Sequence, residues 1–201
     1  MKKSIDFYMV TISPWCYLSL KRLKSLSNEQ KVEINLKPID IMSIFKENQT
    51  KGVKERPVPV QKNRLNELKR WSDYLNIELN TIPKFHPVNP EMSSKLIIAS
   101  LLFENNFEKT FSLVTKLCEA VWINDLNVSE LATVSKIANQ EGFSNDIVER
   151  SLSDQTVIEQ LNKNTTLAKK NNVFGVPTFI YGNDLFFGQD RLFMLENSIK
   201  K

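Results

Sequence analysis

Two short segments rich in strand-forming residues, separated by one amphipathic segment, limit the folds that this chain can adopt. Residues 5–10 read Ile-Asp-Phe-Tyr-Met-Val, and residues 32–36 alternate apolar and polar side chains. Between them Ser13 is a natural helix N-cap, Pro14 suits the first helical position, and leucines recur at helical spacing up to about Asn28. Because two strands joined by one helix lie parallel in a sheet, the sequence predicts a βαβ unit.

From about residue 39 to residue 171 the strand pattern disappears and helical periodicity replaces it. Apolar residues between Leu65 and Leu75 predict one amphipathic helix, and a wide apolar stripe predicts the longest helix from about Pro90 to Asn124. We find no internal repeat and no low-complexity segment. This part of the chain is therefore expected to be all helical.

Strand patterns return near the end. Residues 178–181 and 185–187 flank a Gly-Asn-Asp turn, which predicts an antiparallel hairpin, and residues 191–199 predict a final helix. The expected fold class is α/β, with a large all-helical insertion between the second and third strands. We expect one domain from residues 1–38 plus 172–201, and an inserted helical domain from residues 39–171.

Composition and charge exclude several functions. The 201 residues include 27 Lys and Arg against 23 Asp and Glu, a formal charge of +4, and no dense basic stripe carries interleaved aromatic residues, so we expect no nucleic-acid partner. Two cysteines, Cys16 and Cys118, and the single histidine, His86, cannot complete a four-ligand zinc site, so no metal is expected. The sequence shows no signal peptide and no apolar stretch that spans a membrane, which predicts a cytoplasmic protein.

The motif Ser13-Pro14-Trp15-Cys16 lies where the first strand gives way to a helix. A Cys-x-x-Cys pair at this place would be a thiol–disulfide exchange site, because a helix N-terminus lowers the pKa of a thiol. Here serine replaces the first cysteine and cannot form a disulfide. The position that activates a thiol is kept without its own nucleophile, which suggests that the thiol arrives with a ligand.

A second motif, Phe-Gly-Val-Pro-Thr-Phe at residues 174–179, leads into the third expected strand. A cis peptide bond before Pro177 would leave the backbone groups of Val176 as an unpaired edge. A plain loop proline is the alternative, since only about 5–6% of X–Pro bonds in folded proteins are cis. Together with the Ser-Pro-x-Cys junction, the motif favours the cis form.

These motifs together resemble one branch of the thioredoxin fold. Residues 11–18, 175–178 and 187–192 resemble DsbA-type proteins, kappa-class glutathione transferases and 2-hydroxychromene-2-carboxylate isomerases, with the greatest specificity for the last two. Residues 70–72 and 82–89 are similar to the isomerases' run from an insertion helix into a proline-rich loop. The resemblance spans essentially the whole chain and implies a thioredoxin-like fold.

The resemblance also implies glutathione as a cofactor. Ser13 would donate a hydrogen bond to the glutathione sulfur as the catalytic residue; a plain helix N-cap is the alternative, and both roles can coexist. The implied cofactor-binding residues are Asn48, Lys62, Val176, Pro177, Gln189, Asp190 and Arg191. The implied substrate pocket comprises Trp15, Cys16, Phe85 and Asn89.

Within that set, the backbone of Val176 would pair with the cysteinyl peptide, and Gln189 and Asp190 would hold the γ-glutamyl end. Asn48 and Lys62 would hold the glycine end. Three alternatives remain: a helix N-cap for Asp190, a solvated surface position for Lys62, and a buried helix position for Cys16. Leu65 stands where the isomerases often have tyrosine, which leaves the substrate open.

The implied activity is that of a glutathione-dependent isomerase. A bound thiolate would add reversibly to a conjugated acid, the temporary single bond would rotate, and elimination would release the isomer. The alternatives are a kappa-like glutathione transferase, a DsbA-type thiol–disulfide oxidoreductase using Cys16, and a non-catalytic binding module. A small-molecule substrate and a homodimer are the expected partners, with no membrane association.

Overall fold

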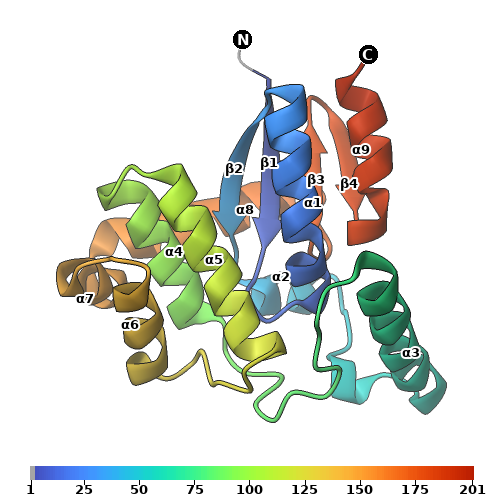
Figure 1. The fold of residues 1–201 in the computed structure, drawn as a ribbon, viewed down its shortest axis with the longest axis horizontal. Coiled ribbons are helices and arrows are strands. Elements are labelled where there is room, and N and C mark those ends of the chain that lie inside the picture. The colour runs from blue at the N-terminus through green and yellow to red at the C-terminus, as the bar shows by residue number, and fades with distance from the viewer. Residues whose placement is uncertain (1–2) are drawn as a thin grey trace.

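The computed structural model describes residues 3–201, which form a four-stranded mixed sheet with the order β2-β1-β3-β4 (Figure 1). Strand β1 (Ser4–Met9) pairs in parallel with β2 (Glu33–Pro38). It pairs on its other side, antiparallel, with β3 (Thr178–Tyr181), and β3 forms a hairpin with β4 (Asp184–Phe187). The predicted βαβ unit and the predicted hairpin are both confirmed.

Helices cover both faces of the sheet. Helices α1 (Pro14–Gln30) and α9 (Leu192–Ile199) lie on one face, and α2 (Ile41–Glu47) and α8 (Gln155–Lys170) lie on the other (Figure 1). Because side chains alternate along a strand, β1 and the residue after it supply both cores. Ile5, Phe7 and Met9 enter the larger core, and Tyr8 and Val10 enter the smaller one.

The remaining helices lie to the two sides of the sheet (Figure 1). Helix α3 (Val58–Leu75) follows a single turn of 3-10 helix, η1 (Val53–Glu55), and stands near the N-terminal end of α1. On the other side lie α4 (Glu91–Phe103), α5 (Phe107–Trp122), α6 (Leu131–Gln140) and α7 (Asn145–Ser153). Helices α2 and α8 belong to the predicted insertion, residues 39–171, yet pack on the sheet, and the boundary between two domains stays a prediction.

The prediction of one long helix between Pro90 and Asn124 was wrong. The chain breaks into α4 and α5 at Asn105, whose φ of 48° is left-handed, a conformation that asparagine tolerates. The next residue, Asn106, caps α5 by accepting a hydrogen bond from the Lys109 N–H at 3.1 Å. The apolar stripe continues across the break, because both helices pack on one core.

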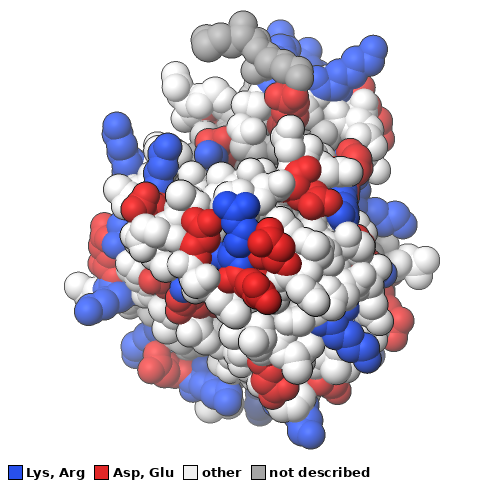
Figure 2. All heavy atoms as spheres, turned by 90° about the vertical axis from the view of Figure 1, so that its left-hand side faces the viewer, with Lys and Arg blue, Asp and Glu red and all other residues white. Residues whose placement is uncertain are grey.

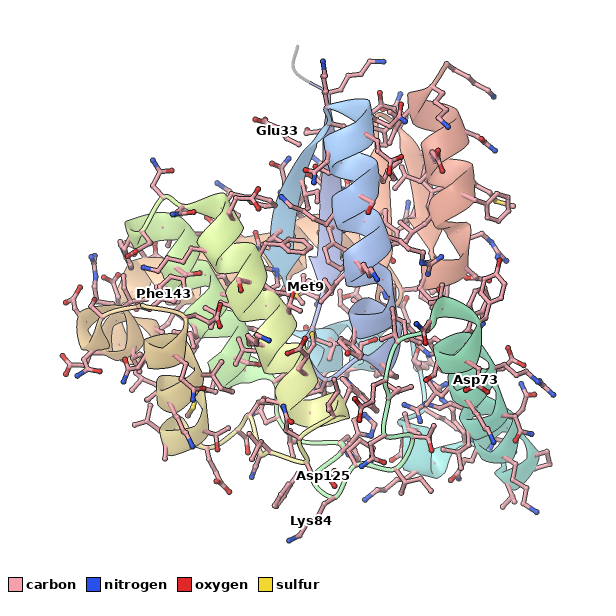
Figure 3. The ribbon with its side chains drawn as sticks, viewed as in Figure 1. Met9, Glu33, Asp73, Lys84, Asp125 and Phe143 are labelled. Carbon is pink, nitrogen blue, oxygen red and sulfur yellow. The ribbon has the colours of Figure 1, made fainter. Side chains whose placement is uncertain are left out.

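The loop after α3 and the loop after α5 are tied together at the base of the molecule. One carboxylate oxygen of Asp125 accepts hydrogen bonds from the Asn80 side chain at 2.9 Å and from the Lys84 backbone N–H at 3.1 Å (Figure 3). This holds the proline-rich segment 81–90 against the end of α5.

Two surface properties follow. On the face shown in Figure 2, Lys and Arg side chains are interspersed with Asp and Glu. Across residues 3–201, no helix combines the length and the apolar character needed to cross a membrane.

Candidate functional site

The turn between β1 and α1 places Ser13 at the helix N-terminus. The Ser13 N–H donates to the Val10 carbonyl at 3.2 Å, and the Ser13 hydroxyl accepts from the Cys16 N–H at 3.3 Å. Pro14 occupies the first turn of the helix, and Ser13 is 8% exposed. Ser13 is therefore the N-cap of α1: its hydroxyl oxygen is the acceptor in this bond, and its O–H can rotate to donate to a neighbouring acceptor.

Helices α4 and α5 and the segment before α4 support this turn. The indole N–H of Trp122 donates to the Thr11 carbonyl at 3.3 Å, and the hydroxyls of Thr11 and Ser93 lie 2.7 Å apart. The His86 ring packs on Trp122 with centroids 4.8 Å apart. Burial, and next the charge of Arg64, lowers the pKa of His86 to about 4, so this imidazole is neutral near pH 7.

The structure places Cys16 in the core and not on a cavity wall. Its side chain is 0% exposed, and burial raises the pKa of its thiol to about 12, although hydrogen bonds from Ser13 and the Val10 backbone oppose this rise. Cys118 is equally buried, and its pKa is raised by burial and by the proximity of Cys16. Neither thiol is set up to ionise near neutral pH.

The peptide bond between Val176 and Pro177 is cis, which confirms the prediction; the bond between His86 and Pro87 is also cis. The Pro177 carbonyl accepts a hydrogen bond from the Gly188 N–H at 2.9 Å, so the loop before β3 is bound to the end of β4. Within residues 3–201, neither the N–H nor the carbonyl of Val176 has a hydrogen-bond partner. The expected unpaired backbone edge is present.

A cavity of about 350 Å³ lies between the start of α1, helix α3 and the loops on either side of the β3–β4 hairpin. We call it the site cavity. Five of the residues implied by the resemblance line it: Trp15, Val176, Pro177, Gln189 and Asp190. The others that line it are Arg56, Val60, Asn63, Arg64, Glu67, Trp71, Phe187 and Gly188.

Three implied residues lie outside the site cavity on exposed surface. Asn48 ends α2, and its side-chain amide donates to the Ile44 carbonyl at 3.1 Å. Lys62 is exposed on α3, which agrees with the alternative that it is a solvated surface residue. Asn89 accepts from the Glu91 N–H at 2.9 Å and lines a separate cavity of about 220 Å³.

Two further implied residues also lie outside it. Phe85 is half-buried, with the Lys84 ammonium 5.1 Å from its ring centroid. Arg191 is exposed and forms an ion pair with Asp190 at 2.5 Å. The N-cap alternative for Asp190 was wrong, because Arg191 occupies the N-cap position of α9 and no side chain caps that helix.

Two arginines of the site cavity were missed. Arg64 is half-buried, has no hydrogen bond or ion pair with any residue in the range 3–201, and has its pKa lowered to about 10 by burial and by Arg56. The Nε of Arg56 donates to the Lys51 carbonyl at 3.2 Å. A usable sequence signal was the helical spacing of the residues on one face of α3: Val60, Asn63, Arg64, Glu67 and Trp71.

The opposite wall of the cavity is a 3-10 turn, η2 (Gln189–Arg191), held by α1. Gly188 precedes it with a φ of 95°, and a Cβ there would meet the Asp190 carboxylate at 2.5 Å, so glycine is required. The guanidinium of Arg22 donates to the Gln189 carbonyl at 3.0 Å and to its side-chain oxygen. In the described part of the chain, no cluster of three or more His, Cys, Asp or Glu could hold a metal ion.

Comparisons with known proteins find similar sequences and a similar fold. The chain is 28% identical over 196 residues to a 2-hydroxychromene-2-carboxylate isomerase of Pseudomonas sp. (strain C18), covering 97% of this chain and 89% of that protein. It is 26% identical to the protein of that name from Pseudomonas putida, covering 97% and 93%. A solved structure of a 2-hydroxychromene-2-carboxylate isomerase superposes with a TM-score of 0.81 at 24% identity, covering 98% and 94%.

The family model described as DSBA-like thioredoxin domain matches residues 4–200. The match spans the sheet and every helix between its strands, so the predicted α/β, thioredoxin-like fold with a helical insertion is confirmed. The chain belongs to the DSBA-like thioredoxin domain family.

Proposed function

We propose that this protein is a glutathione-dependent isomerase acting on a conjugated small acid, as its relatives' name suggests. The observation that carries the proposal is a convergence: Trp15, in the first turn of the helix that Ser13 caps, and Val176, whose backbone is unpaired, line one cavity together with two arginines and Asp190. A redox cysteine is missing from this place, so a thiol brought by a ligand fits it.

The donors and acceptors of the site cavity match the charges of glutathione, a tripeptide with one ammonium and two carboxylates. Val176 offers one N–H and one carbonyl to an extended peptide, as in strand addition. Asp190 and Gln189 would hold the amino-acid end. Arg64, with Arg56 beside it, would hold the glycine carboxylate, since Lys62 lies outside the cavity.

When bound, glutathione supplies a thiolate that adds reversibly to a conjugated carbon and so permits rotation about a former double bond. The chain's own contribution starts with the Ser13 hydroxyl, whose O–H can turn from the Cys16 sulfur to donate to the sulfur of a ligand. The N-terminus of α1 adds a partial positive charge at the same place. Both favour the charged form of a thiol and lower its pKa. Trp15 and Trp71 provide flat apolar surface for a conjugated acceptor.

The other activities considered for this fold differ in what they require. A thiol–disulfide oxidoreductase requires an accessible thiolate, and burial of Cys16 opposes this. A transferase would use the same thiolate but consume it. Product mass separates the two, because a transferase product retains glutathione and an isomerase product has the mass of its substrate.

The test is titration of the purified protein with glutathione, followed by calorimetry and by the ultraviolet absorbance of the thiolate near pH 7. We expect saturable binding and a thiolate signal larger than that of free glutathione. Incubation with a hydroxychromene carboxylate should then give a product of unchanged mass. Absence of both heat and thiolate signal would remove glutathione from the proposal.

A further inference from the structure

Arg22 lies behind the site cavity and does not line it. It projects from α1 two turns beyond Pro14 and joins three walls of the site. Its guanidinium donates to the backbone carbonyl and to the side-chain oxygen of Gln189, and its carbon Cζ lies 5.9 Å from the centroid of the Trp71 ring. Its Nε atom is buried and has no partner among residues 3–201.

This contact determines which end of the Gln189 amide faces the site cavity. A guanidinium can only donate, so the amide atom beside Arg22 must be the oxygen. Gln189 is 2% exposed and lines the cavity, and its amide nitrogen has no acceptor within the described chain. The Gln189 amide therefore presents N–H donors to a ligand, which suits a carboxylate and not an ammonium.

The neighbouring Asp190 has the opposite polarity. Its carboxylate accepts a hydrogen bond from the exposed Arg191, and its negative charge stabilises the positive charge of Arg22. Burial lowers the pKa of Arg22 from its ordinary value, and Asp190 opposes that change. A ligand end that carries both charges thus finds an acceptor for its ammonium in Asp190 and, beside it, a donor for its carboxylate in Gln189.

We propose that Arg22 is a positioning residue that fixes the Gln189 amide as a donor, and thereby selects ligands whose amino-acid end carries a free α-carboxylate. The glutathione arm of this proposal rests on the proposed function above. The fixing of Gln189 by Arg22 does not, because it is a property of the protein without ligand.

The ligand-free test is the nitrogen–proton spectrum of the Gln189 side-chain amide, assigned by its loss in Gln189→Glu. We expect Arg22→Met to shift both amide proton signals. Lys21→Met is the matched control, because it removes one positive charge from the same turn of α1 at an exposed residue. Signals that do not move in Arg22→Met, in a variant that still unfolds cooperatively, would overturn the proposal.

The ligand test compares glutathione with 4-aminobutanoyl-cysteinylglycine, which lacks only the α-carboxylate. Since a hydrogen bond to a charged group contributes about 1.5–3 kcal/mol, Arg22→Met and Gln189→Glu should each weaken glutathione binding about tenfold or more. Both should change binding of the analogue by less than about twofold, and so should Lys21→Met for either peptide. Equal losses of affinity for the two peptides would overturn the proposed selection of the α-carboxylate. If the wild-type protein binds neither peptide, the proposed function is overturned. The amide spectrum then tests by itself whether Arg22 fixes the Gln189 amide.

Discussion

The hydroxyl of Ser13 has two tasks, and substitutions can separate them. Ser13→Ala removes both the helix cap and the proposed donor, so we expect bound glutathione to have a raised thiol pKa and turnover to fall about ten- to a thousandfold. Loss of the cap alone should cost about 1 kcal/mol of unfolding free energy. Thiolate absorbance against pH and the rate of isomerisation are the two measurements.

Ser13→Asp is the control, because aspartate caps a helix but its carboxylate cannot donate. We expect this variant to keep its stability and to lose the thiolate signal. A thiol pKa that stays low in both variants would assign the activation to the helix terminus and not to the hydroxyl.

Arg64 and Lys62 form a matched pair for the glycine end of glutathione. Arg64→Met should weaken glutathione binding about tenfold, since it removes a half-buried cation from the cavity wall. Lys62→Met removes the same charge from the exposed surface of the same helix and should change binding less than about twofold. Calorimetry at two salt concentrations measures both, and a larger effect at Lys62 would restore the role that the resemblance implied.

At the scale of elements, sequence patterns predicted those helices and strands that depend on residues close together in the chain. The strands and α1 were predictable because alternation, capping and proline position act within a few residues. Cavity residues in β1–α1 and beside the hairpin were found because they belong to short motifs. Arg64 was missed because its role depends on how α3 is rotated: two residues correspond to about 200° around a helix, so Lys62 and Arg64 point to opposite sides.

The segment 81–90 and α5 meet through His86 and Trp122, and this contact should depend on pH. The pKa of His86 is about 4 in the folded protein against an ordinary value of 6.5. A depressed histidine pKa means that the unfolded chain binds the extra proton between these values, so stability is complete above pH 6.5 and falls as the pH drops towards 4. The loss is on the order of 3 kcal/mol.

Urea unfolding of wild type and His86→Gln at pH 7, 5.5 and 4.5 measures this effect. We expect the stability difference between the two proteins to shrink as the pH falls, because only the wild type titrates at this position. A constant difference would show that His86 is accessible to protons in the folded state.

At the scale of the whole molecule, both thiols report on the core. Cys16 and Cys118 are each 0% exposed, so a thiol-reactive dye should label neither in the folded protein. In denaturant both should become reactive with the same dependence on concentration, because they share one hydrophobic core. Mass spectrometry of labelled peptides follows each site, and selective labelling of Cys16 without denaturant would contradict the placement described above.

The position of β1 inside the sheet has a consequence for synthesis. On one side β1 pairs with β2, made shortly after it, but on the other Ile5 pairs with Tyr181. During translation the ribosome must therefore make nearly the whole chain before that second edge of β1 can be covered. An apolar strand with one unpaired edge can form backbone hydrogen bonds with other nascent chains and so aggregate. Expression yield and chaperone dependence should thus respond more to the pace of translation across the helical block than to the stability of the finished protein.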